Sequence, residues 1–178
     1  MAMHPNALLI ERLFTALDRH DAAAMASCYR DDAVTFHDIA FHIVEKSRLY
    51  GMWRMICEGE SGIHVTIKSI TADDREGEAR IVDEYRFGRN TSRHKEGHPV
   101  VNEITSRFRF RDGLIEEQFD SCDEREWARQ AMGGPVGWVA GRSRLLRALP
   151  ANGKLKRFLR KHPVPPPVSP AVAPGSRS

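Results

Sequence analysis

Acidic side chains occupy two strand faces that are otherwise apolar. In the segment DDAVTFHD, Asp38 comes two positions after Phe36. In EARIVDEYRFG, Asp83 lies two positions from both Ile81 and Tyr85. Because successive side chains of a strand point to opposite sides, each acid shares a side with its apolar neighbours. A carboxylate in such surroundings loses hydration, which raises its pKa and makes it a better proton acceptor near neutral pH. The pattern predicts acid–base chemistry in an apolar hollow.

A long hairpin over residues 100–122 adds two further polar groups. Asp112 and Gly113 separate two runs of strand-forming residues, and an Asp-Gly link favours a two-residue turn because both positions tolerate positive φ. On the first strand, Asn102 and Ser106 lie on the face formed otherwise by Val, Ile and Phe. Buried polar atoms need partners or line a cavity. We therefore predict that both side chains line a ligand pocket.

Three more residues complete the predicted site. Trp53 lies on the apolar side of a helix expected over residues 46–58, and Gln118 and Asp120 share a face of the last strand. Together with Asp83 and Tyr85 they would place a few polar groups among apolar walls, which is typical of a pocket for a small hydrophobic molecule. For Trp53, simple packing in the core is the alternative.

The elements that must position these residues follow a helix, helix, strand, helix order and then a meander of strands. Apolar spacing predicts helices over residues 6–20, 22–30 and 46–58, with Asn6 and Asp21 as N-caps of the first two, and a further helix capped by Asp123. Strands are expected over residues 64–72 and 78–88 before the hairpin. With no alternation of strands and helices, the fold class is α+β, with a curved antiparallel sheet wrapped on the N-terminal helices.

Composition excludes several classes of protein. The 178 residues are 41% hydrophobic, enough for one domain with a buried core, and no apolar run of about 18 residues or signal-peptide pattern is present. We expect a cytoplasmic location. The three cysteines lack C-x-x-C spacing, and His64, His94 and His98 lack metal-ligand partners. Without a glycine-rich phosphate loop as well, no metal or cofactor is expected.

Charge divides the chain into unequal parts. All 24 acidic residues precede position 127, whereas 10 of the 27 basic residues follow it. We predict a main domain over residues 1–140, a basic helical extension over 141–162 interrupted by Pro150 and Gly153, and a disordered proline-rich tail over 163–178. The extension is expected to form a lid or dimer-flanking helix, with weak contact to an anionic membrane as an alternative. Nucleic-acid binding is not expected, because bases stack on aromatic side chains and the basic extension contains one aromatic residue, Phe158.

Four segments resemble the SnoaL-like polyketide cyclases of the nuclear transport factor 2-like superfamily. They are DDAVTFHD, GMWRMI, NEITSRFRFRDGLIEEQFDSCD and EWARQAMGGPVGW, and the resemblance covers residues 6–140. It implies a cone-shaped half-barrel with a deep pocket at its open end, in a homodimer that pairs through the sheet. The superfamily hosts unrelated reactions on one scaffold, so the fold alone does not decide the function.

The same resemblance implies roles for individual residues. Asp38 matches the general base of the superfamily's isomerases, and Asp120 matches an acid/base aspartate of the cyclases. Leu13 and Ser106 stand where ketosteroid isomerase carries its two oxyanion donors, which argues against steroid isomerisation. Gln118 replaces a histidine of many relatives, and glutamine cannot shuttle protons at neutral pH.

The predicted function is therefore a cofactor-free acid–base enzyme of the cyclase, isomerase or dehydratase type. Asp38 and Asp120 would be its working carboxylates, acting on a small apolar or polyketide-like molecule. Two alternatives stay open. One is a non-catalytic ligand-binding or interaction module of the same fold, and the other is water activation as in the superfamily's epoxide hydrolases, to which Asp83 could supply one acid. Those epoxide hydrolases activate water with an Asp-Arg-Asp arrangement, and the predicted apolar faces contain no arginine.

Overall fold

The structure is a computed structural model that describes residues 3–59, 61–88 and 96–163. Its helices are α1 (Pro5–Asp18), α2 (Ala22–Ala26), α3 (Lys46–Cys57), α4 (Glu124–Met132), α5 (Gly134–Ala140) and α6 (Arg144–Lys161). Its strands are β1 (Thr35–His37), β2 (His42–Ile43), β3 (His64–Ala72), β4 (Glu76–Phe87), β5 (His98–Arg111) and β6 (Leu114–Cys122). The α+β class predicted from the sequence is confirmed.

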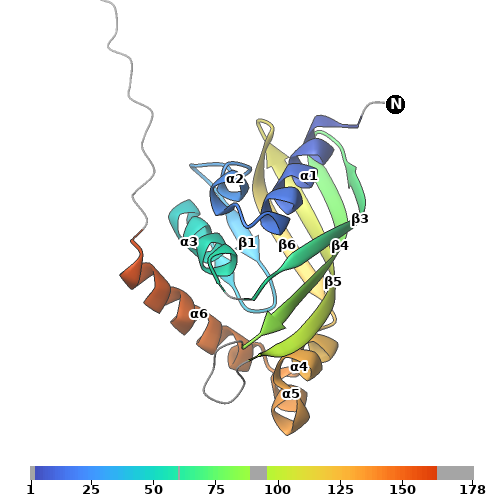
Figure 1. Cartoon of the computed structure of the whole chain (residues 1–178). Coiled ribbons are helices and arrows are strands. Elements are labelled where there is room, and N and C mark those ends of the chain that lie inside the picture. Colours follow the sequence, from blue (N-terminus) through green and yellow to red (C-terminus); the bar gives the residue numbers. More distant parts are fainter. Residues whose placement is uncertain (1–2, 60, 89–95, 164–178) are drawn as a thin grey trace, which may run out of the picture.

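The six strands form one curved, unclosed sheet in the order β2-β1-β6-β5-β4-β3 (Figure 1). Helices α1, α2 and α3 lie against its concave side, and α4 and α5 lie at one end of the sheet. All neighbouring strands are antiparallel except β1 and β6, which pair in parallel with Thr35 opposite Glu117. This pair departs from the all-antiparallel prediction, because the short strands β1 and β2 add to the edge that the last strand leaves free.

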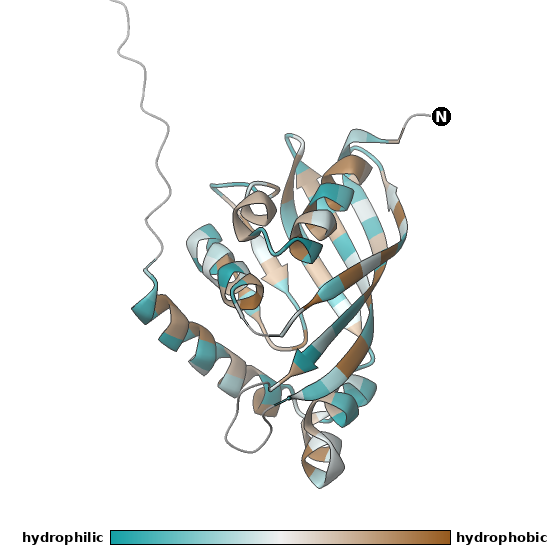
Figure 2. Ribbon diagram, viewed as in Figure 1, coloured by the Kyte–Doolittle hydropathy of each residue, from teal (hydrophilic) through white to brown (hydrophobic). Residues whose placement is uncertain are grey.

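The hairpin of β5 and β6 has the predicted two-residue turn. Asp112 and Gly113 adopt φ values of 54° and 73°, and Arg111 pairs with Leu114 across the two-residue loop. The alternation along β5 is also as predicted, since Phe108 is 2% exposed while its neighbours Arg107 and Arg109 lie on the exposed face. Hydrophilic and hydrophobic residues alternate along these strands (Figure 2), and the buried ones include Val100, Phe108 and Ile115.

The hydrophobic core lies between this concave side and the three N-terminal helices. Its largest fully buried side chains include Ile10, Leu13, Tyr29, Phe36, Leu49, Met52 and Ile115. Aromatic contacts join helices to strands, as between Phe14 of α1 and Phe108, whose ring centroids lie 6.1 Å apart. A smaller cluster around Trp127 and Val100 joins α4 to the end of β5.

Two of the three predicted helix caps are correct. Asp21 accepts a hydrogen bond from the backbone N–H of Ala24, and Asp123 accepts from the first turn of α4. The prediction for α1 was wrong, because His4 is the N-cap residue and Asn6 lies inside the helix. The Asn6 side chain instead donates to the carbonyl of Asp73 at 2.8 Å. A long-range partner thus replaces the local capping role.

The C-terminal extension was predicted to be a helix interrupted at Pro150 and Gly153, but it is continuous. Helix α6 runs through Pro150 and Gly153 without interruption, and α5 precedes it as a helix that the sequence pattern did not predict. Tertiary contacts outweigh the hydrogen bond that a proline removes from a helix. Leu155 is fully buried beside α3, and the guanidinium group of Arg147 donates to the carbonyl of Ala140 at 2.7 Å and forms an ion pair with Glu124.

Two predictions concern residues outside the described part of the chain. They are the disorder of the proline-rich tail, of which only Pro163 is described, and the absence of a metal partner for His94. Among the described residues, no helix combines the length and the apolar character that crossing a membrane requires.

Candidate functional site

Asp120 is held in a fixed orientation on the concave side of β6. The side-chain amide of Gln118 donates to both carboxylate oxygens of Asp120, at 2.9 and 3.0 Å. The hydroxyl of Tyr29, at the end of the α2 segment, donates to the Gln118 side-chain oxygen. Because this oxygen is the acceptor, the amide nitrogen must face the carboxylate. The chain Tyr29, Gln118, Asp120 therefore fixes the direction in which Asp120 presents its oxygens.

The surroundings of Asp120 raise its pKa to about 7. Desolvation is the largest cause, the side chains of Ser106 and Gln118 lower the pKa, and the negative charge of Asp38 raises it further. Ser106 is the cross-strand partner of Asp120 and lies close to it, although its hydroxyl makes no hydrogen bond of ordinary geometry among the described residues. Asp120 keeps part of its surface open to solvent. A carboxyl group with this pKa can accept or donate a proton at neutral pH.

Asp83 is a second interior acid, on β4. Desolvation raises its pKa to about 7, its cross-strand partner Asn102 lowers it, and the charge of Asp120 raises it. Its Oδ1 atom is buried and has no hydrogen-bond partner among the described residues. An unpaired buried carboxyl oxygen is costly when ionised. A proton on Asp83, or a ligand that donates to it, would relieve that cost.

One carboxylate oxygen of Asp38 forms part of a turn. Asp38 follows β1 directly, and its Oδ1 atom accepts hydrogen bonds from the backbone N–H groups of Ala40 and Phe41, at 2.7 and 2.5 Å. These bonds form a tight turn. Desolvation nevertheless raises the pKa of Asp38, against the lowering effect of the two amides and of Arg144. The carboxyl thus shapes the turn and also interacts electrostatically with Asp120.

Tyr85, Trp53 and Ser106 carry hydrogen-bond donors in or beside this region of the interior. The hydroxyl oxygen of Tyr85 accepts from the indole N–H of Trp127 at 2.6 Å, which leaves the Tyr85 proton free to be donated elsewhere. Burial raises the pKa of Tyr85, so the group stays protonated. The indole nitrogen of Trp53 and the hydroxyl of Ser106 are buried without a partner among the described residues. The Trp53 N–H lies beside the Tyr29 hydroxyl, and the Ser106 hydroxyl lies beside Asp120.

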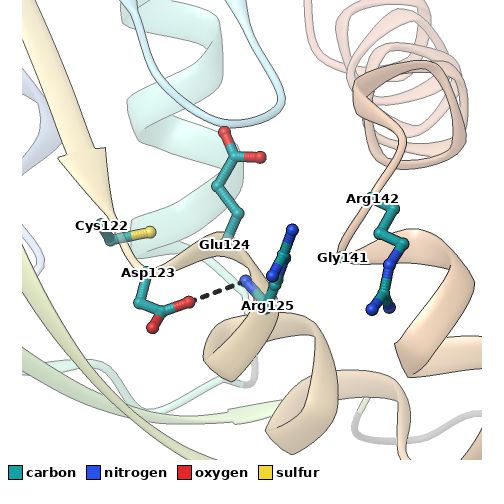
Figure 3. A pocket seen from close by; sticks show the side chains of 6 residues that line it. All are labelled: Cys122, Asp123, Glu124, Arg125, Gly141 and Arg142. Carbon is teal, nitrogen blue, oxygen red and sulfur yellow. Dashed lines mark hydrogen bonds between the residues drawn. The ribbon is translucent and has the colours of Figure 1, made fainter.

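Two hollows in the surface of the described residues lie elsewhere. One, of about 410 Å³, is formed where β6, α4 and α5 meet (Figure 3), and its lining is Cys122, Asp123, Glu124, Arg125, Gly141 and Arg142. Figure 3 shows the Asp123 carboxylate bonded to the Arg125 amide. The other, of about 730 Å³, extends over β1, β3, β4, β5 and β6 and includes Gln118 and Phe119. Neither hollow is lined by Asp38, Asp83 or Asp120.

No metal or arginine partner joins the interior acids within the described part of the chain. No group of three or more His, Cys, Asp or Glu side chains there could hold a metal ion. No ion pair links an arginine of the described residues to Asp38, Asp83 or Asp120. The buried arginine, Arg147, pairs with Glu124 instead. The Asp-Arg-Asp arrangement of water activation is therefore not formed by these residues.

The structure brings most of the predicted site residues into one interior region. Asp38, Asp83, Tyr85 and Asp120 influence one another's pKa, and Asn102, Ser106 and Gln118 contact them from neighbouring positions of the sheet. Trp53 packs edge-on against Phe36, as its core alternative required, yet its N–H stays unpaired. Whether these residues bind a ligand stays a prediction.

Sequence reasoning missed two members of this region, Tyr29 and Trp127. For Tyr29, a useful signal was the hydroxyl group on an otherwise apolar stripe, because such a buried group needs a partner. Cys122, whose thiol pKa rises to about 12 by desolvation and the nearby acids, also belongs to the region.

Comparison with known proteins agrees with the geometry. The model of the SnoaL-like domain matches residues 10–118 of this chain. No curated protein matches the sequence.

Three solved structures illustrate the likeness in fold. An LEH-like epoxide hydrolase of M. tuberculosis is 21% identical, with a TM-score of 0.59, over 76% of this chain and 95% of that chain. A protein of Xanthomonas campestris named as a polyketide cyclase is 18% identical, with a TM-score of 0.57, over 71% and 96%. A protein of Jannaschia sp. CCS1 named as a SnoaL-like polyketide cyclase is 14% identical, with a TM-score of 0.60, over 74% and 94%.

These identities are low, so the three structures support the fold and not a particular reaction. The family match spans more than half of the chain, and the six-stranded curved sheet with its N-terminal helices agrees with it. The chain therefore belongs to the SnoaL-like domain family and has the nuclear transport factor 2-like fold.

Proposed function

We propose that this protein is a cofactor-free acid–base enzyme that moves a proton within a small, mostly apolar or polyketide-like molecule, as in a cyclisation, an isomerisation or a dehydration. The observation that carries the proposal is the orientation of Asp120. Gln118 and Tyr29 hold its carboxyl group, and desolvation raises its pKa to about 7. A general acid or base works best when its pKa lies near the working pH.

A second carboxyl group completes the proton transfer. Asp38 lies near enough to Asp120 for each charge to disfavour the other, and one oxygen of Asp38 makes no hydrogen bond among the described residues. In such a pair, one group is protonated while the other is ionised over a range of pH. The ionised and the protonated carboxyl group of this pair could then act as base and acid on two positions of one substrate.

The unpaired donors suit the oxygen of a carbonyl group. When a base removes a proton next to a carbonyl, negative charge develops on that oxygen, and preorganised donors stabilise it. The N–H of Trp53, the hydroxyl of Ser106 and the hydroxyl of Tyr85 are the donors in this region. They would take the place of the tyrosine and aspartic acid that ketosteroid isomerase uses.

The test is the exchange of carbon-bound hydrogen. We would incubate the protein in D₂O with a panel of cyclic ketones, aryl ketones and 1,3-diketones and follow deuterium uptake by mass spectrometry. General-base catalysis contributes roughly 10²- to 10⁴-fold, so Asp120→Asn is expected to lose at least about 100-fold in rate. Glu103→Gln, on the exposed face of β5, is the matched control and should retain the full rate.

Two results would overturn the proposal. One is equal exchange by the unmodified protein, Asp38→Asn and Asp120→Asn; the other is exchange by the unmodified protein no faster than in buffer alone for every member of the panel.

A non-catalytic ligand-binding module is the second candidate, and the turn at Asp38 favours it. Asp38 uses one oxygen to bind Ala40 and Phe41, which is sufficient reason for an acid at this position. This candidate predicts that a ligand raises the melting temperature of Asp120→Asn as much as that of the unmodified protein, with no deuterium uptake by either. Native mass spectrometry of the purified protein would reveal a molecule retained in its interior.

A further inference from the structure

The C-terminal helices expose a cluster of large apolar side chains. Leu145, Leu149 and Trp138 are 70%, 69% and 64% exposed, respectively. The full cluster, here called the α5–α6 face, consists of Val136, Trp138, Val139, Leu145, Leu146 and Leu149. Large exposed apolar patches on a folded domain mark interaction sites. This one lies at the end of the molecule away from α1 and α2, and hydrophobic positions of α5 are visible there in Figure 2.

The segment that carries the α5–α6 face, residues 134–161, contains basic residues and no acidic residue. Asp123 and Glu124, at the start of α4, line the same hollow as Arg142, and Glu124 is paired with Arg147. Arg142 and Arg144 lie between the two halves of the face, and the last acidic residue of the chain is Glu126. Further along α6, Lys156 and Arg160 are exposed, and they follow Leu145 and Leu149 by 11 residues in each case. Since 11 residues make about three helical turns, all four side chains lie on one side of α6. That side is apolar in its first half and basic in its second.

The opposite side of α6 is fixed to the domain, so the α5–α6 face cannot turn inward. Leu155 is fully buried, and Arg147 is 3% exposed. The Arg147 guanidinium binds Glu124 of α4, the carbonyl of Ala140 in α5 and the carbonyl of Ile39 in the turn after β1. These contacts join three helices and one loop. The outward position of the leucines is therefore built into the fold.

We propose that the α5–α6 face binds the surface of an anionic lipid membrane. Apolar side chains beside clustered Lys and Arg, with a tryptophan among them, are the features of helices that lie in the membrane interface. The guanidinium of Arg142 lies 3.8 Å from the Trp138 ring centroid, which places a cation directly beside the apolar anchor. Basic residues near an anionic surface add attraction for each charge.

Charge favours a membrane over a second copy of this chain. Two copies joined through this face would bring Arg142, Arg144 and the basic half of α6 together, and residues 134–161, which form both helices, contain no acid of their own to compensate. Like charges across an interface disfavour association. An anionic lipid surface supplies the compensating charge along the whole helix. Membrane binding here does not require the carboxyl chemistry of the interior, so Asp120→Asn should bind as the unmodified chain does.

The experiment is co-sedimentation of the full chain with vesicles. Vesicles of phosphatidylcholine with about 30% phosphatidylglycerol are expected to bind the protein at least tenfold more tightly than vesicles of phosphatidylcholine alone. Raising the salt to about 0.5 M should weaken the binding, because it screens the charges. The double variant Leu145→Ser/Leu149→Ser should lose binding by about tenfold or more. Leu8→Ser, at an exposed leucine of α1, is the matched control and should bind normally.

Circular dichroism should show equal helix content in all variants, since the substituted leucines are exposed. Three results would refute membrane binding by this face. They are equal binding of neutral and anionic vesicles, no binding to either, and normal binding by the double variant. A dimer in light scattering that Leu145→Ser/Leu149→Ser dissociates, without vesicle binding, would also refute it and assign this face to a second copy. Binding of an acidic protein by this face in place of anionic vesicles would refute it in the same way.

Discussion

Gln118 donates two hydrogen bonds to the carboxylate of Asp120, of 2.9 and 3.0 Å, two positions further along the same strand. Side chains two apart on a strand share a face, so this contact is built into β6. A glutamine at this position orients a neighbouring acid and takes no part in proton transfer itself. The site thus depends on one titrating group that a neutral amide holds in place.

The first prediction concerns Gln118→Leu. Gln118 lowers the pKa of Asp120, so its removal is expected to raise that pKa above about 7 and to move the pH midpoint of deuterium uptake upward. The rate at the optimum should fall by about tenfold, because the carboxyl is no longer oriented. Carbon-13 NMR titration of the Asp120 carboxyl measures the pKa directly.

Tyr29→Phe is the control for Gln118→Leu. It removes only the hydroxyl bound to Gln118 and leaves the amide facing Asp120, so the shift in pKa should be smaller. An unchanged Asp120 midpoint in Gln118→Leu would show that the amide does not control this acid.

The second prediction concerns stability against pH. The pKa of Asp83 is about 7 in the folded state and about 3.9 in an unfolded chain. A raised pKa means that the folded state holds the proton more tightly, so the stabilising contribution is complete below about pH 4 and is lost as the pH rises through 7. Since one pKa unit corresponds to about 1.4 kcal/mol, the loss is on the order of a few kcal/mol.

Asp83→Asn should remove the part of this dependence that Asp83 contributes and leave the part from Asp120, whose pKa is also raised to about 7. Urea unfolding at pH 5 and at pH 8 measures it, with Asp112→Asn in the exposed hairpin turn as the control. The free energy of unfolding should differ less between pH 5 and pH 8 in Asp83→Asn than in the unmodified protein. An equally large difference would contradict the assignment of the proton to Asp83.

The third prediction concerns the bond from Trp127 to Tyr85. Tyr85→Phe keeps the ring and removes the oxygen that accepts from the indole N–H at 2.6 Å. An unsatisfied buried donor costs about 1–3 kcal/mol, so the free energy of unfolding should fall by that amount. Tyr50→Phe, whose ring lies on α3 beside Arg54, is the control and should change little. Equal stability of the two variants would show that the N–H of Trp127 finds another acceptor.

The fourth prediction compares two glycines. A Cβ atom at Gly77 would lie 2.9 Å from Ile10 Cδ1 and 3.0 Å from Phe110 Cε2, so Gly77→Ala should destabilise the fold by about 1–3 kcal/mol through overpacking. At Gly153, inside α6, a Cβ atom meets nothing within 4 Å. Gly153→Ala should therefore stabilise the protein by roughly 0.5–1 kcal/mol, as alanine does in helices. Thermal unfolding of both variants tests the pair, and stabilisation by Gly77→Ala would contradict the packing of β4 against α1.

The sequence alone determined the features that depend on neighbours along the chain. Alternation along β5 fixed which side of the sheet is apolar, and Asp112-Gly113 fixed the hairpin, because both are local properties of the backbone. The caps Asp21 and Asp123 were predictable for the same reason. The inward position of Asp83 and Asp120 also followed from alternation, before any tertiary contact was known.

Tertiary structure decided the features whose partners lie far apart in the chain. The Tyr29 hydroxyl meets Gln118 across 89 positions, and Asn6 meets Asp73 across 67, so no local pattern predicts either contact. Burial of Leu155 and Arg147 keeps α6 helical through Pro150, against its local preference. Propensity and alternation act over a few residues, whereas desolvation and hydrogen bonding between segments depend on the folded chain. The inward acids thus came from the sequence, but their raised pKa and fixed orientation came from the fold.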